Sequence, residues 1–130
     1  MTAAPRSGPL QVAILVFDEV ELLDLGGPYE VFTTATRMQQ RLQPGSPALF
    51  AVQCVARTLQ PVRARAGLQV LPDADFATAS APDVLIVPGG VVDAAAACPA
   101  TRAWVAGAAR GRRSARRCAP APSSWRQPAC

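Results

Sequence analysis

The chain has 130 residues, of which 50% are hydrophobic and 17% charged, with 13 prolines and 9 glycines. This length fits one domain that buries its own core, and the composition excludes a collagen-like repeat, a disulfide miniprotein and disorder along the whole chain. No apolar run approaches the roughly 20 residues of a membrane span. The sequence shows no secretory signal, so we expect a soluble cytoplasmic protein whose four cysteines are reduced thiols.

The net charge of +4 hides two different parts of the chain. Residues 1–100 hold all 9 acidic residues and 6 arginines, whereas residues 101–130 hold 7 arginines and no acid. The mildly acidic body gives no reason to expect a nucleic-acid partner. The arginine cluster at residues 110–117 has no interleaved aromatic residues, so we do not expect specific nucleic-acid binding there either.

The first half of the chain predicts a strand, a turn, a helix and a second strand. Residues 1–10 are a loose leader, and residues 11–17 form a continuous apolar run of the kind found in strands buried on both faces. A Gly-Gly-Pro sequence at residues 26–28 predicts a turn, followed by a helix over residues 29–42. Residues 49–56 predict the next strand.

The second half continues the alternation. We expect a short hairpin over residues 62–71, a third strong strand over 82–88 and an alanine-rich helical stretch over 93–105. Pro99 inside that stretch predicts a break or two short helices. The order favours an α/β fold with a mostly parallel sheet. From Gly107 onward the chain loses its hydrophobic period and gains prolines and arginines, so we expect residues 107–130 to be disordered.

Two features at the ends of strands are candidates for chemistry. Asp24 follows the first strand, where ligands bind in open α/β sheets, and a carboxylate there can hold or take a proton. Gly89 and Gly90 follow the third strand, and their N–H groups are suited to binding an oxyanion. From residue type alone, a capping aspartate and a strand-to-helix turn are the better explanations of these residues. Asp18, Glu19 and Glu21 lie in the same loop, and position alone does not choose among them.

The cysteines lack the context of a catalytic thiol. We expect Cys54 to be a small core residue within a strand, Cys98 to lie in a helical stretch before Pro99, and Cys118 and Cys130 to lie in the arginine-rich end. None follows a buried strand on a sharp strand–turn–helix elbow. The sequence contains no histidine, which excludes a Ser–His–Asp triad and a Cys/His metal set, and we expect no metal and no cofactor.

Three segments together resemble the DJ-1/PfpI family. They are VAILVFDEVELLDLGGPYEVF at residues 12–32, GLQVLP at 67–72 and DVLIVPGG at 83–90. The resemblance covers residues 11–106 and is closest to the isonitrile hydratase-like branch and to the sensor domains of AraC-type transcription regulators. It implies a flavodoxin-like doubly wound parallel sheet of the class I glutamine amidotransferase type, here incomplete, in a protein that forms homodimers and takes a small-molecule substrate or ligand.

The resemblance also implies roles for the candidate residues. In that branch the aspartate of the LDLGGP motif, here Asp24, contacts a cysteine nucleophile, and the glycine turn, here Gly89 and Gly90, lines the oxyanion site. A flavodoxin-like strand order places the first and third strands side by side, so these two loops should meet at the carboxyl ends of the strands. We expect the Asp24 side chain to lie within about 6 Å of the glycine backbone, within reach of one small ligand.

The nucleophile itself is missing from the expected elements. The family carries it after the next strand, on an elbow of the type SVCTG followed by an apolar helix. In a shifted reading frame, each new codon takes the third base of one codon and the first two bases of the next. With any codons that encode the given residues from Arg116 onward, this frame permits the sequence SVCTGAFLLAAAGL. We therefore interpret the end of the chain as out of frame, and expect the chain as written to be inactive. The alternatives are a sensor-domain fragment of a regulator and a DJ-1-like redox protein.

Overall fold

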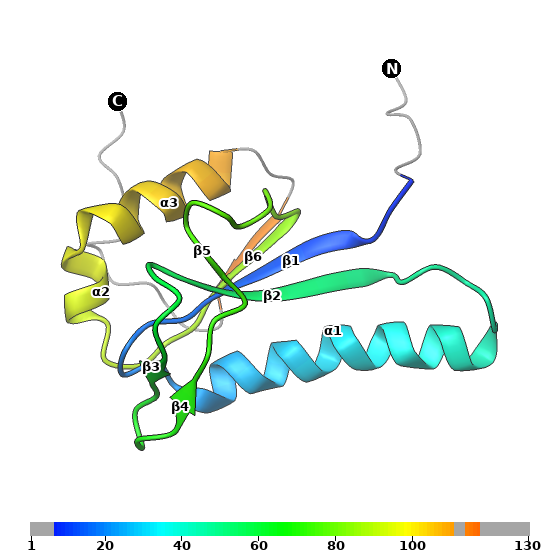
Figure 1. Ribbon diagram of the computed structural model, residues 1–130, viewed down its shortest axis with the longest axis horizontal. Helices are drawn as coiled ribbons and strands as arrows, with labels where there is room; N and C mark the ends of the chain where they lie inside the picture. The colour runs from blue at the N-terminus through cyan, green and yellow to red at the C-terminus, as the bar shows by residue number, and fades with distance from the viewer. Residues whose placement is uncertain (1–6, 111–113, 118–130) are drawn as a thin grey trace.

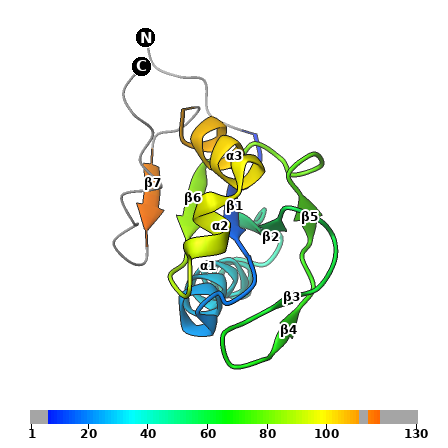
Figure 2. The same cartoon turned by 90° about the vertical axis from the view of Figure 1, so that its left-hand side faces the viewer.

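The computed structural model describes residues 7–110 and the backbone of residues 114–117. Within these residues β1 (Leu10–Leu15), β2 (Phe50–Ala56), β5 (Ala74–Asp75), β6 (Val84–Val87) and β7 (Ser114–Arg117) form one sheet in the order β5-β2-β1-β6-β7. Every pairing in it is parallel, with Ile14 opposite both Cys54 and Ile86. Figure 2 shows β7, β6, β1 and β2 side by side. The predicted parallel sheet, with the first strand between the second and third, is confirmed.

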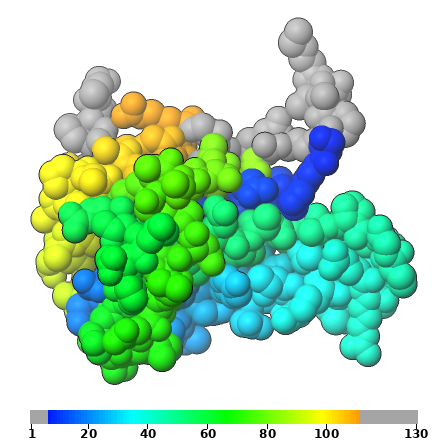
Figure 3. All heavy atoms as spheres, viewed as in Figure 1, coloured from blue at the N-terminus to red at the C-terminus, as the bar shows by residue number. Residues whose placement is uncertain are grey.

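Helices cover the two faces of the sheet. α1 (Leu22–Leu42) lies along one face, and α2 (Asp93–Ala97) and α3 (Pro99–Arg110) lie on the other (Figure 1). In Figure 3 the C-terminal half of α1 forms one end of the molecule and α2 with the start of α3 the opposite end. The predicted hairpin is present as β3 (Val62–Arg63) paired antiparallel with β4 (Gln69–Val70). No helix among the described residues is long and apolar enough to cross a membrane.

The core consists of two clusters on opposite sides of β1. Ala13, Leu15 and Phe17 pack in the cluster that includes residues of α2 and α3, and Val12, Ile14 and Val16 pack in the cluster that includes Leu25 of α1. This alternation is what an extended strand requires when both of its faces are covered. Two aromatic pairs add to the clusters, one on each side: Phe32 with Phe50, and Phe76 with Trp104.

The start of α1 differs from the prediction. The helix begins at Leu22 and includes Gly26, Gly27 and Pro28, which we expected to form a turn before a helix starting at residue 29. Leu25 is only 5% exposed and packs against the core, so tertiary packing overrides the low helix propensity of this segment. The longer helix places Asp24 in its first turn.

The end of the chain also differs from the prediction. α3 continues through Gly107 to Arg110, and residues 114–117 pair with β6, so the expected disorder from residue 107 onward and the expected lack of a further strand are wrong for these residues. The sequence SARR has no strand signal of its own. Backbone hydrogen bonding to the open edge of β6 is sufficient to explain the strand, because such an edge presents unpaired N–H and C=O groups. Residues 118–130 lie outside the described part of the chain.

Candidate functional site

Asp24 and the glycine turn meet at the carboxyl ends of β1 and β6. The Asp24 Oδ2 atom accepts a hydrogen bond from the Gly89 N–H at 2.9 Å, across 65 residues of sequence. This distance confirms the expected proximity of the two loops. Asp24 is the third residue of α1, where a carboxylate is favoured by the helix dipole, and its own N–H donates to the Glu21 carbonyl.

Backbone hydrogen bonds hold the two loops together. The Glu21 N–H donates to the Gly89 carbonyl at 2.9 Å, and the Val91 N–H donates to the Glu19 carbonyl at 3.0 Å. These bonds make an isolated antiparallel bridge between Val20 and Gly90. Gly90 has φ +133°, a backbone conformation that favours glycine. The loop after β1 is therefore fixed to the loop after β6 independently of the Asp24 side chain.

The hairpin holds the loop after β1 from the other side. The Glu19 N–H donates to the Arg63 carbonyl at 2.7 Å, and the Arg65 N–H donates to the Val20 carbonyl at 3.0 Å. Asp18 Oδ1 accepts the Arg63 N–H at 2.9 Å, and an exposed ion pair joins Glu21 to Arg65 at 3.4 Å. The Asp18 and Glu21 side chains thus bond to the hairpin, whereas the Asp24 side chain bonds to the glycine turn.

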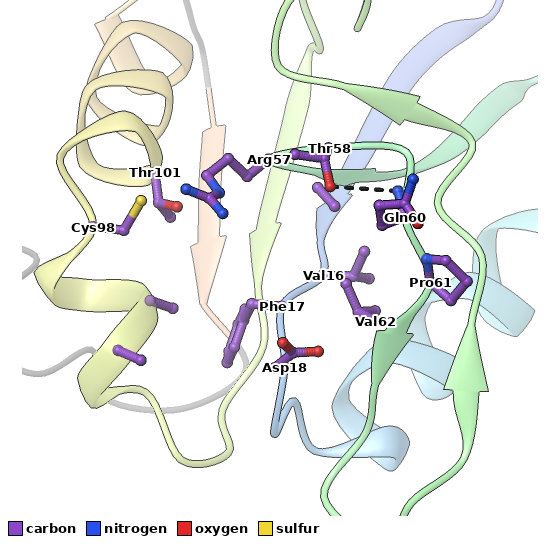
Figure 4. Close-up of a pocket in the computed structure, with 13 residues that line it drawn as sticks. Val16, Phe17, Asp18, Arg57, Thr58, Gln60, Pro61, Val62, Cys98 and Thr101 are labelled. Atoms are coloured by element: carbon purple, nitrogen blue, oxygen red, sulfur yellow. Dashed lines mark hydrogen bonds between the residues drawn. The ribbon is translucent and has the colours of Figure 1, made fainter.

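A pocket of about 560 Å³ lies beside this site, at the carboxyl ends of β1 and β2. In Figure 4 Cys98 and Thr101 lie on one side, the Arg57 side chain reaches toward them, and Phe17 and Asp18 lie at the bottom. The sequence did not reveal this pocket, because its walls come from three separate stretches, residues 16–18, 56–62 and 94–101. Within the described residues, no group of three or more His, Cys, Asp or Glu side chains is placed to hold a metal ion.

Cys98 lies at the break that Pro99 predicts in the helical stretch. It is partly exposed and lies between α2 and α3, directly before the first residue of α3. Hydrogen bonds from the Thr101 hydroxyl and backbone N–H lower the pKa of its thiol, and the Arg57 guanidinium adds to this effect. The sequence signal was Pro99, because proline at a first helical position marks the preceding residue as the cap.

Cys54 occupies the opposite environment. It is buried in β2, as expected, with 6% of its surface exposed. Burial, with the nearby charge of Asp73, raises the pKa of its thiol from the ordinary value of 9.0 to about 11. Its N–H donates to Asp73 Oδ2 at 2.7 Å, and the Asp73 N–H donates to the Cys54 carbonyl. Such a thiol is unreactive at neutral pH.

Comparisons with known proteins agree with this geometry. The chain is 40% identical over 84 residues to an uncharacterized protein in the cpoL 5' region of Streptomyces lividans. This match covers 65% of this chain and 54% of that protein. It is 36% identical over 81 residues to the isonitrile hydratase of Pseudomonas putida. That match covers 62% of this chain and 30% of that enzyme. The chain therefore spans about half of one relative and less than a third of the other.

Solved structures show the same fold. A THiJ/PfpI family protein from Pseudomonas syringae superposes with a TM-score of 0.69 at 29% identity, over 88% of this chain and 48% of that one. A DJ-1 superfamily protein from Salmonella typhimurium gives a TM-score of 0.64 at 19% identity, over 83% of this chain and 54% of that one. The model of the DJ-1/PfpI family matches residues 10–118. The chain belongs to the DJ-1/PfpI family.

Proposed function

We propose that this chain is the N-terminal part of an enzyme that adds water to an isonitrile or a similarly small electrophile through a cysteine thiolate. The observation that carries the proposal is the 2.9 Å hydrogen bond between Asp24 and the Gly89 N–H, at the carboxyl ends of adjacent parallel strands. A proton-carrying group and an N–H donor for developing negative charge are thereby brought to one point. The 36% identity to the isonitrile hydratase of Pseudomonas putida supports the reaction class.

The proposed reaction balances with water as the only co-substrate. The thiolate adds to the terminal carbon of the isonitrile, and Asp24 delivers a proton to that carbon, giving a thioimidate. Water then adds to the same carbon, the thiol leaves, and the product is an N-substituted formamide. Asp24 serves as the acid–base group in both steps. Gly89 and Gly90 form the backbone site for developing negative charge, and the Asp24–Gly89 bond must open before the Gly89 N–H can serve in this way.

The nucleophile belongs directly after β7. The register pairs Arg117 with Val87, two residues before Gly89, so β7 ends at the same edge of the sheet as β6. The out-of-frame hypothesis places the elbow SVCTG at this point of the chain. The family match ends at residue 118, within the segment where the out-of-frame hypothesis places this elbow. We propose that the 130-residue chain is inactive because this elbow is not translated in frame.

The nucleotide sequence from codon 107 through and past codon 130 tests this proposal. We expect an inserted or missing base before the codon for Arg116, and a restored frame that encodes the elbow and an apolar helix. A confirmed original frame would overturn the proposed nucleophile. A restored frame that continues into a pair of helix-turn-helix segments would instead indicate the ligand-sensing domain of an AraC-type regulator.

A further inference from the structure

The loop after β1 is held in an unusual conformation. Glu19 has φ +70°, which L residues with a side chain rarely adopt. Its side chain is exposed, while its backbone is bonded on both sides: its N–H donates to the Arg63 carbonyl, and its carbonyl accepts the Val91 N–H. These backbone bonds therefore hold Glu19 in this conformation, since an exposed side chain contributes little packing.

Gly90 is the point of closest approach between the two loops. A Cβ atom at this position would lie 2.2 Å from the Glu19 carbonyl oxygen and 2.8 Å from the Glu21 nitrogen. Both are backbone atoms, so neither can move aside as a flexible side chain would. Gly90 lies between Gly89 and Val91, whose backbone groups make the reciprocal bonds to residues 19 and 21. Any side chain here forces the two loops apart.

A separation of the two loops would also displace Asp24, through the start of α1. Glu21 is the N-cap of α1, and its carbonyl accepts the Asp24 N–H, so the position of Glu21 sets the position of the first helical turn. A displacement of the loop moves Asp24 away from the Gly89 N–H. We propose that Gly90 is a positioning residue, whose lack of a side chain lets the loop after β1 lie close enough for Asp24 to reach Gly89. This assigns Gly90 a role distinct from donating to an oxyanion, and it rests on the proposed site.

The matched pair Gly90→Ala and Gly27→Ala tests the proposal. Gly27 lies on α1 close to Asp24 in sequence, and a Cβ there meets no atom within 4 Å. By amide hydrogen exchange, we expect Glu21 and Val91 to exchange about tenfold faster or more in Gly90→Ala, and Gly27→Ala to leave both rates unchanged. Equal exchange in the two variants would overturn the proposal.

A second readout separates positioning from general stability. In the wild-type chain, Asp24→Asn should change the Gly89 amide chemical shift, because it alters the acceptor of that hydrogen bond. In the Gly90→Ala background the same replacement should leave the Gly89 shift nearly unchanged. A full response there would show that Asp24 still reaches Gly89 and would contradict the proposal.

The wild-type chain keeps the proposal testable if Gly90→Ala does not fold. The Glu21, Gly89 and Val91 amides should open as one unit, with the same opening free energy and the same dependence on urea. A Gly89 amide that opens independently of the other two would overturn the proposal. None of these experiments measures turnover. If the three amides open as one unit but the hydratase assay fails, the proposed reaction is contradicted and the positioning role of Gly90 is not.

Discussion

The two described cysteines should differ sharply in reactivity toward iodoacetamide. The pKa of Cys54 is raised to about 11, whereas that of Cys98 is lowered from the ordinary value of 9.0. At neutral pH the thiolate fraction of Cys98 therefore exceeds that of Cys54 by at least ~100-fold, since each pH unit below a pKa lowers the fraction about tenfold. The higher intrinsic nucleophilicity of the more basic thiolate offsets this by roughly tenfold.

We therefore expect Cys98 to react at least about tenfold faster than Cys54 at pH 7. The burial of Cys54, which is 6% exposed, can only widen this ratio, because its strand must open before the reagent reaches the sulfur. The rates can be measured by quenched labelling and mass spectrometry of tryptic peptides. Cleavage after arginine places Cys54 in peptide 42–57 and Cys98 in peptide 66–102, and the cysteines of the end segment fall in other peptides.

Three controls identify the cause of the difference in reactivity. In high urea both thiols should react at similar rates, because the folded environment is lost. Thr101→Val should slow Cys98 at pH 7 but not at alkaline pH, where the thiol is ionised in both variants, because it removes the hydroxyl that stabilises the thiolate. Thr33→Val, on α1 at the opposite face of the sheet, should have no effect. Equal rates for the two cysteines in the folded chain would refute the contrast between a buried Cys54 and a hydrogen-bonded, accessible Cys98.

Three further predictions concern stability, measured by urea unfolding. Burial raises the pKa of Cys54 in the folded chain to about 11, so its contribution to the free energy of unfolding is fully present below pH 9 and is lost as the pH rises. The loss should reach about 3 kcal/mol between pH 9 and 11, and Cys54→Ala should remove this pH dependence. Glu19→Gly should stabilise the chain by about 1 kcal/mol, because glycine adopts φ +70° without strain, and a loss of stability would contradict the loop geometry. Asp73→Ala should cost about 1–2 kcal/mol by leaving the Cys54 N–H without its acceptor, and an unchanged midpoint would count against that hydrogen bond.

Much of the fold followed from local pattern. The apolar run before Asp18 predicted a strand buried on both faces. The strand order implied by the family resemblance, rather than local pattern, predicted that Asp24 and Gly89 would meet. The hairpin and the division of the helical stretch at Pro99 were also predicted, because turn and proline signals act locally.

The differences arise where distant contacts override local preference. The early start of α1 depends on the burial of Leu25 against the sheet, which outweighs the Gly-Gly-Pro signal. β7 depends on the open edge of β6, since its own residues carry no strand pattern. Arg57, which directly follows β2, adds to the larger effect of Thr101 on the pKa of the Cys98 thiol, and only the fold brings Arg57 there. Spacing in the sequence does not specify contacts of this kind.

Isonitrile turnover by the frame-restored protein tests the proposed function most directly. The restored protein should convert an isonitrile to the formamide, and the 130-residue chain should show no conversion above background. Asp24→Asn in the restored protein should lower kcat/KM by a factor on the order of 10²–10⁴, the usual contribution of one acid–base group, and Glu30→Gln, an exposed acid on the same helix, should leave it unchanged. Conversion by the 130-residue chain itself, or full activity of the Asp24→Asn protein, would contradict the proposed function.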